Sequence, residues 1–213
     1  MSFDITTLII KIPVLLFALT IHEYAHGRVA LAMGDPTALR AGRLTMNPIR
    51  HIDPFGAICL FLFNFGWARP VPIDPRYFKD YRRATIYVSV AGPLANLCAA
   101  LAAGLLVRYT LMPWDLYRQV LLYLLLMNIG LGLFNLIPIP PLDGSHILEN
   151  LLPRRAAIGY QSLRRYGPLL LIGIILLDNF AHTGIISFIL LKPMFHLAHL
   201  FAGDGFFRLI GIL

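Results

Sequence analysis

The apolar stretch from about Ile5 to Met33 is the feature that most limits what this chain can fold into. It is long enough to cross a bilayer as one helix, yet His22, Glu23 and His26 lie within it. Ionisable side chains are costly to place in lipid, so their presence indicates a functional site by default. The chain is 58% hydrophobic and 14% charged, whereas soluble domains are about 25% charged. We therefore expect residues 1–213 to form a single integral-membrane domain.

The run His22-Glu23-Tyr24-Ala25-His26 forms an H-E-x-x-H pattern. On a helix this spacing places the two imidazoles one turn apart on one face, with the carboxylate of Glu23 beside them. The pattern is typical of a zinc site with a built-in general base. The alternative is an ordinary helix whose histidines point to a polar surface. A third ligand elsewhere in the chain would decide between the two.

Two further stretches, about 84–107 and about 120–137, are also long and apolar enough to span a membrane. The first is rich in small residues, which permit close helix packing. The second is followed by three prolines before Asp143, and these break the helix. C-terminal helices are expected over about 168–213. Together these segments predict an all-α polytopic membrane protein, a bundle of about four to five membrane helices.

Residues 37–83 differ from these spans because they carry many basic side chains. Within them, the run from Phe55 to Trp67 is apolar apart from Asn64. That run is too short to span a bilayer as a helix, so it predicts a re-entrant or interfacial segment at about 44–66. Non-helical backbone at such a depth must be covered by protein or line a wet cavity.

The arginine-rich regions 37–83 and 145–166 orient the chain, because cytosolic loops carry an excess of basic residues. Both regions are predicted in the cytosol, with the N-terminus and the 108–118 turn outside. The motif at 22–26 then lies in the cytosolic half of the first span, and Asp143 follows the cytosolic end of the third. The two are expected at the same membrane depth. This topology also explains the net charge of +7, so no nucleic-acid partner is expected.

Asp143 is therefore the natural third ligand. Catalytic zinc takes three protein ligands and leaves its fourth position for water, and His22, His26 and Asp143 would supply two nitrogens and one oxygen. Zinc lowers the pKa of its water toward about 7. Glu23 would accept a proton from that water and then donate to the leaving amine. For Asp143 taken alone, the alternative is an Asp-Gly turn at a helix end.

These motifs resemble those of the site-2 proteases, the intramembrane zinc metalloprotease family M50. The resemblance rests first on the H-E-x-x-H at 22–26 and on the run Asn135-x-x-Pro138-x-Pro140-Pro141-Leu142-Asp143-Gly144. Four more blocks match: Arg43-Leu44-Thr45-Met46-Asn47-Pro48, His51-Ile52-Asp53-Pro54, Phe65-Gly66-Trp67-Ala68-Arg69-Pro70-Val71-Pro72 and Ala91-Gly92-Pro93-Leu94-Ala95-Asn96. They cover most of the chain to about residue 150. The chain is similar to the compact members that lack PDZ and CBS modules.

The resemblance implies a multi-pass protease of the cell membrane that cuts transmembrane protein substrates by regulated intramembrane proteolysis. It implies one Zn2+ per chain, bound by His22, His26 and Asp143, with Glu23 as the catalytic base. Asn135 would lie beside the metal and support the substrate or the oxyanion. The alternative for Asn135 is a buried amide that only caps the broken helix.

The resemblance also assigns roles outside the metal site. Asn96 would help hold the substrate backbone, or would only bond a neighbouring helix. The segment 44–66 would form a re-entrant β-hairpin that pairs with unwound substrate, since an edge strand satisfies freed backbone groups. Two other functions stay open, a catalytically silent adaptor and a metal or ion transporter. The intact Glu23 argues against the first, and the lack of evident inverted repeats against the second. A homo-oligomer is left open.

Other polar residues have weaker assignments. The loop setting of His51 favours a surface or loop-anchoring role. His146 could bond a metal ligand, but a structural role is preferred. Asp178 and His182 form a pair, one turn apart in the C-terminal region, that this reasoning leaves unexplained.

Overall fold

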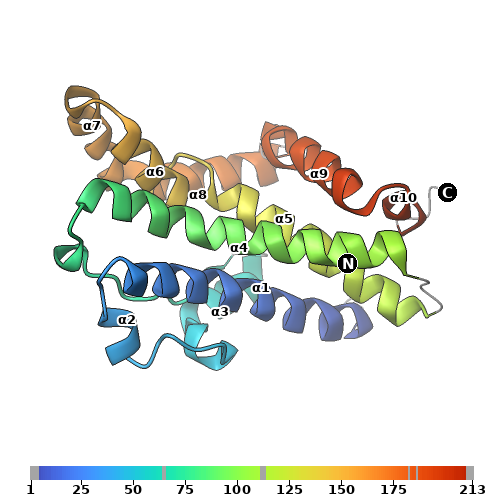
Figure 1. Cartoon of the computed structure of the whole chain (residues 1–213). Coiled ribbons are helices and arrows are strands. Elements are labelled where there is room, and N and C mark those ends of the chain that lie inside the picture. Colours follow the sequence, from blue (N-terminus) through green and yellow to red (C-terminus); the bar gives the residue numbers. More distant parts are fainter. Residues whose placement is uncertain (1–4, 64–65, 111–113, 182, 186, 210–213) are drawn as a thin grey trace.

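The computed structural model describes residues 5–63, 66–110, 114–181, 183–185 and 187–209, and most of them are helical (Figure 1). The α-helices are α1 (Ile5–Ala32), α2 (Thr37–Arg40), α3 (Pro54–Phe63), α4 (Tyr81–Tyr109), α5 (Asp115–Asn135), α6 (Asp143–Leu151), α7 (Arg154–Gln161), α8 (Leu163–Ala181), α9 (Lys192–Ala202) and α10 (Gly205–Leu209). Two short 3-10 helices, η1 (Pro48–His51) and η2 (Pro75–Tyr77), and a π-helical turn, η3 (Ser187–Leu191), complete the described elements.

Three of the described helices are long and apolar enough to cross a membrane, and they cover Thr7–Ala32, Tyr81–Tyr109 and Asp115–Asn135. They correspond to the three core spans expected from the sequence, although α4 and α5 begin a few residues earlier than expected. The helices α8 and α9 do not meet the same criteria, because α8 carries charges near both ends and α9 is short. The all-α class is confirmed, and a fourth and a fifth membrane helix remain predictions.

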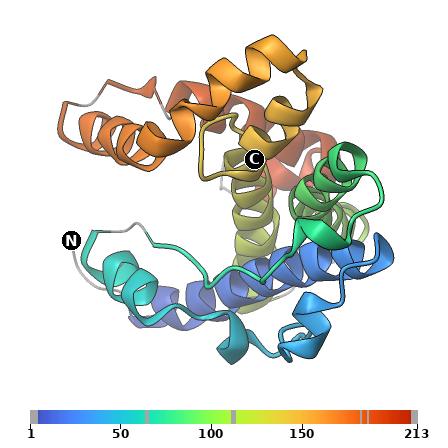
Figure 2. The same cartoon turned by 90° about the vertical axis from the view of Figure 1, so that its left-hand side faces the viewer.

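The helix α4 packs against α1, α5, α6 and α9 (Figures 1 and 2). Its buried positions are mostly alanine, glycine and valine, which let neighbouring helices approach closely. One core cluster joins α4 to α5, α9 and α10. A second cluster joins the C-terminal part of α1 to the start of α4.

The segment 44–66 is where the structure departs from the expected β-hairpin. Its described part holds η1 and the helix α3, and no strand forms in the described residues beyond one antiparallel bridge between Ile52 and Ala68. The helix starts where Asp53 Oδ1 accepts a hydrogen bond from Gly56 N at 2.9 Å and Pro54 takes the first helical position. An acidic cap followed by proline favours a helix start over a strand. A re-entrant depth for this segment stays a prediction.

The two arginine-rich regions share one end of the bundle. In Figure 1, α2 and α7 both lie at the end where α1 finishes and α4 begins. The fold therefore brings α2 of the first region and α7 of the second to one end of the bundle, which agrees with the positive-inside argument.

Candidate metal centre

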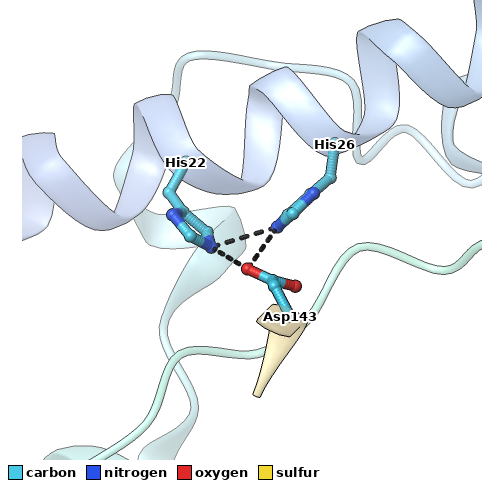
Figure 3. A group of neighbouring side chains, drawn as sticks. All are labelled: His22, His26 and Asp143. Atoms are coloured by element: carbon cyan, nitrogen blue, oxygen red, sulfur yellow. Dashed lines mark hydrogen bonds and ion pairs between the residues drawn. The ribbon is translucent and has the colours of Figure 1, made fainter. Parts of the chain in front are cut away.

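Two histidines of α1 project from one face of the helix toward the start of α6 (Figure 3). Because His22 and His26 are four residues apart, their rings lie one turn from each other. The ring centroids are 4.6 Å apart and the rings are nearly perpendicular. Both side chains are buried, so α1 presents two imidazoles to the interior of the bundle.

The third member of the site follows a tight turn after α5. That helix ends at Asn135, and the proline-rich turn leads to Asp143, the first residue of α6. The turn depends on Gly144, because a Cβ there would lie 2.2 Å from Leu136 O. Any larger residue would collide with backbone, so the glycine fixes where Asp143 begins the helix.

The three side chains converge on one point. Asp143 Oδ2 lies 3.1 Å from His22 Nε2 and 3.3 Å from His26 Nε2, and the two Nε2 atoms are 3.0 Å apart. In the described part of the chain, this is the one group of three such side chains that could hold a metal ion.

The partners of the outer ring nitrogens set which atom carries the hydrogen. His22 Nδ1 lies 2.6 Å from Asn96 Oδ1, and His26 Nδ1 lies 2.7 Å from the carbonyl oxygen of Val88. Both partners are acceptors, so each Nδ1 donates, and in the neutral imidazole each Nε2 then presents a lone pair to the centre. Two imidazole lone pairs and a carboxylate oxygen this close together form a donor set that suits zinc.

The space in front of these nitrogens exists because residue 92 is glycine. A Cβ on Gly92 would lie 2.5 Å from His26 Nε2 and 2.7 Å from His22 Nε2. Those distances are only slightly longer than a Zn–N bond of about 2.0–2.1 Å. The donor set and the space between the donors therefore fit an ion of this size.

Glu23 lies beside the histidines on α1 and lines the same pocket. Its Oε2 accepts a hydrogen bond from Val71 N at 2.8 Å. One oxygen is thus held by backbone, and no hydrogen bond to the other forms among the described residues. The carboxylate is partly exposed, which is the environment that a proton acceptor for a bound water needs.

The segment that contacts Glu23, residues 66–74, is named the site loop here. It is held at two further points by buried charged side chains. Arg43 Nη2 donates to Arg69 O at 2.7 Å, and Asp35 Oδ2 accepts from Asp74 N at 2.7 Å. The site loop is therefore a fixed wall of the site.

The pocket at the centre has a volume of about 640 Å³ and is lined by α1, the site loop, α4, α5, α6 and α8. Asn135 lines it, while its amide donates to Leu131 O of its own helix at 3.0 Å. Asn96 does not line the pocket. It is fully buried behind His22. The structure therefore places Asn96 against the ring of His22 and not in the wall of the pocket.

Two further histidines among the described residues have partners outside the group of His22, His26 and Asp143. His51 is buried and its Nε2 lies 2.9 Å from Thr45 O, so it anchors a loop. His146 lines the pocket, and its Nδ1 lies 3.0 Å from Arg164 Nη2. Burial and the nearby Arg164 cation lower the pKa of His146.

The pair expected in the C-terminal region is seen only in part. His182 lies outside the described residues. Asp178 Oδ1 accepts a hydrogen bond from Thr183 Oγ1 at 2.8 Å, so it links the last turn of α8 to the residues that follow.

Three contributors to the site were missed by sequence reasoning. They are Gly92, the carbonyl of Val88, and Asn128, which bonds Asn96. The spacing of Gly92 and Asn96 held a signal, because residues four apart share a helix face. A backbone carbonyl leaves no such signal in a sequence.

Comparison with known proteins supports the same interpretation. The profile of "Peptidase family M50" matches residues 110–177. A Bacillus subtilis protein named "Putative zinc metalloprotease YwhC" is 42% identical over 161 residues, which is 72% of this chain and 74% of that protein. The Mycobacterium tuberculosis protein named "Putative zinc metalloprotease Rip2" is 33% identical over 143 residues, or 63% of this chain and 54% of that protein. No solved structure gives a significant match.

A bundle with three apolar helices of membrane-spanning length and an H-E-x-x-H centre defines a membrane metalloprotease. This chain belongs to peptidase family M50, the site-2 protease family.

Proposed function

We propose that this chain is an intramembrane zinc metalloendopeptidase, a single domain that hydrolyses peptide bonds within or near transmembrane segments of membrane proteins. The observation that carries the proposal is that Asp143 meets His22 and His26 beside Glu23, and that the helix α1, which carries the two histidines and Glu23, is apolar enough to span a membrane. A soluble metalloprotease would have no need of such surroundings. The fit of the donor set supports one zinc ion per chain.

The residues of the site have distinct roles. His22, His26 and Asp143 hold the ion, and zinc when bound polarises a carbonyl and lowers the pKa of water. Glu23 accepts the proton of the attacking water and passes it to the leaving amine. The hydrogen bond from Val71 N orients the carboxylate and leaves its second oxygen to take that proton.

The substrate is expected to reach the centre as extended chain. A helix shields its amide groups, so a transmembrane segment must unwind before attack, and the freed backbone groups then need partners. Asn135 lines the pocket at the broken end of α5 and has an amide oxygen to offer. We assign it to support of the substrate or the oxyanion.

The orientation follows from charge. The arginine-rich regions lie at the end of the bundle where α1 finishes, and the positive-inside rule assigns that end to the cytosol. The protein is accordingly a multi-pass protein of the cell membrane, with the N-terminus outside and the site toward the cytosolic side.

The test compares the membrane and soluble proteomes of cells that carry the wild type or Glu23→Gln. Cytosolic fragments of membrane proteins should disappear in the variant, while purified Glu23→Gln retains about one zinc per chain by elemental analysis. Asp115→Asn is the matched control, because Asp115 is an exposed carboxylate at the start of α5. It should behave like the wild type.

Two other outcomes would contradict the assignment of a protease. Fragments that persist in Glu23→Gln but vanish on deletion of the gene would indicate an adaptor. Zinc flux through proteoliposomes, equal for both proteins and without any cleavage, would indicate a transporter.

A further inference from the structure

A chain of buried amides lies behind one metal-ligand position. His22 Nδ1 lies 2.6 Å from Asn96 Oδ1, and Asn96 Nδ2 donates to Asn128 Oδ1 at 2.9 Å. Asn128 Nδ2 in turn donates to Leu124 O at 2.8 Å. Both asparagines are fully buried, at 0% exposure. Three helices, α1, α4 and α5, are thus joined by one line of polar groups.

The direction of every hydrogen bond in this chain is determined by backbone carbonyls. Asn96 Nδ2 also donates to Ala18 O at 2.9 Å, so the amide nitrogen of Asn96 has two acceptors. Asn128 cannot turn its amide round, because Leu124 O requires a donor. With its nitrogen engaged twice, Asn96 must present oxygen to the ring of His22.

The consequence reaches the metal side of that ring. Since Asn96 presents an acceptor, His22 must carry its hydrogen on Nδ1, which leaves the Nε2 lone pair free for a cation. The amide is neutral, so it achieves this without adding a charge to the apolar interior. Burying the two amides costs little free energy, because each of their oxygen and nitrogen atoms has a hydrogen-bond partner.

We propose that Asn96 and Asn128 are positioning residues that fix the tautomer and the ring orientation of His22 for metal binding. Asn128 acts through Asn96 and contacts no ligand atom of the site. The inference rests on the proposed zinc site, and it gives Asn128 of α5 a part in that site although its hydrogen bond reaches the site only through Asn96.

The experiment measures zinc affinity by competition with a chelating dye, on the purified full-length chain in detergent. Asn96→Ala should bind zinc roughly 10- to 100-fold more weakly than the wild type, the usual effect of losing a partner behind a ligand. Asn128→Leu should weaken binding by up to roughly 10-fold. The double variant should be no weaker than Asn96→Ala alone, because the second residue acts through the first.

A matched control removes a buried hydrogen bond that does not reach the site. Thr20 is 2% exposed and donates to Leu16 O of its own helix at 2.6 Å. Thr20→Val should keep the zinc affinity of the wild type. Thermal unfolding of the metal-free proteins, followed in parallel, separates loss of folding from loss of affinity.

Unchanged zinc affinity in Asn128→Leu and in Asn96→Ala would overturn the inference, as would an additive effect of the two changes. Affinity losses matched by Thr20→Val would also overturn it, since they would reflect packing alone. Zinc binding that does not depend on His22 would contradict both the inference and the proposed function. Weaker binding in the two variants, with no proteolysis by the wild type, would uphold the positioning role and reject the protease.

Discussion

Gly92→Ala adds one methyl group at the point where the ion would bind. The added Cβ would lie 2.5 Å from His26 Nε2, and 2.7 Å from both Cε1 and Nε2 of His22. Favourable contact between heavy atoms requires about 3.5 Å, so the methyl group is about 1 Å too close to two rings. Because α4 is packed on several sides, the rings must move.

The size of that movement decides the expected effect. Metal sites tolerate errors of about 0.2 Å in ligand distance, and a shift of about 1 Å exceeds this several-fold. We expect zinc affinity to fall by about 100-fold or more, which corresponds to about 2.7 kcal/mol. Folding should suffer less. The crowding costs about 1–3 kcal/mol, and alanine in place of helical glycine returns up to about 1 kcal/mol.

The assay is zinc content and affinity of the purified protein, together with its thermal unfolding midpoint without metal. Gly130→Ala on α5 is the matched control, because its Cβ would meet only Met194 Sδ, at an ordinary 3.6 Å. It should bind zinc as the wild type does. Wild-type zinc affinity in Gly92→Ala would refute the reasoning, since the methyl group and an ion cannot share that space.

The remaining predictions concern the elements around the ion. Asp143→Ala should lower zinc affinity by about 100-fold or more, because it removes one of three ligands; undiminished zinc by elemental analysis would exclude it from the site. Gly144→Ala should reduce both zinc content and the unfolding midpoint, because its Cβ would lie 2.2 Å from Leu136 O; a change in neither would show that the turn can relax. Asp35→Ala should destabilise the metal-free protein by about 1–3 kcal/mol, as it removes the acceptor of Asp74 N and of Thr37 N, while zinc content by elemental analysis stays at the wild-type level. An unchanged midpoint would mean that the site loop is held elsewhere.

The meeting of His22, His26 and Asp143 could be predicted from the sequence because their positions follow simple periodicities. His22 and His26 are related by the helix repeat, and Asp143 was placed near them by the lengths and directions of the three spans. The orientation of the spans came from arginine counts. None of these arguments needs knowledge of side-chain packing.

The β-hairpin expected at 44–66 shows where such reasoning stops. An apolar run of this length suits a strand pair or a short helix equally, and the family resemblance favoured the strands. The local signal was Asp53 followed by Pro54, which caps and starts a helix. Asn96 shows a second limit. An amide in an apolar helix indicates a polar contact. Its partner depends on how the helix is rotated in the bundle, and the periodicity of the sequence does not give that rotation.

The ligand geometry also determines how the chain is tied together. The helix α6 packs on α4 and α7, whereas α1 packs on α4 and α5, so the two elements that carry the ligands share no major interface. An ion between His22 and Asp143 would join residues 121 positions apart and act as a cross-link across that gap. Since the ion would bind only the folded arrangement, zinc binding would stabilise the folded chain against unfolding by linkage.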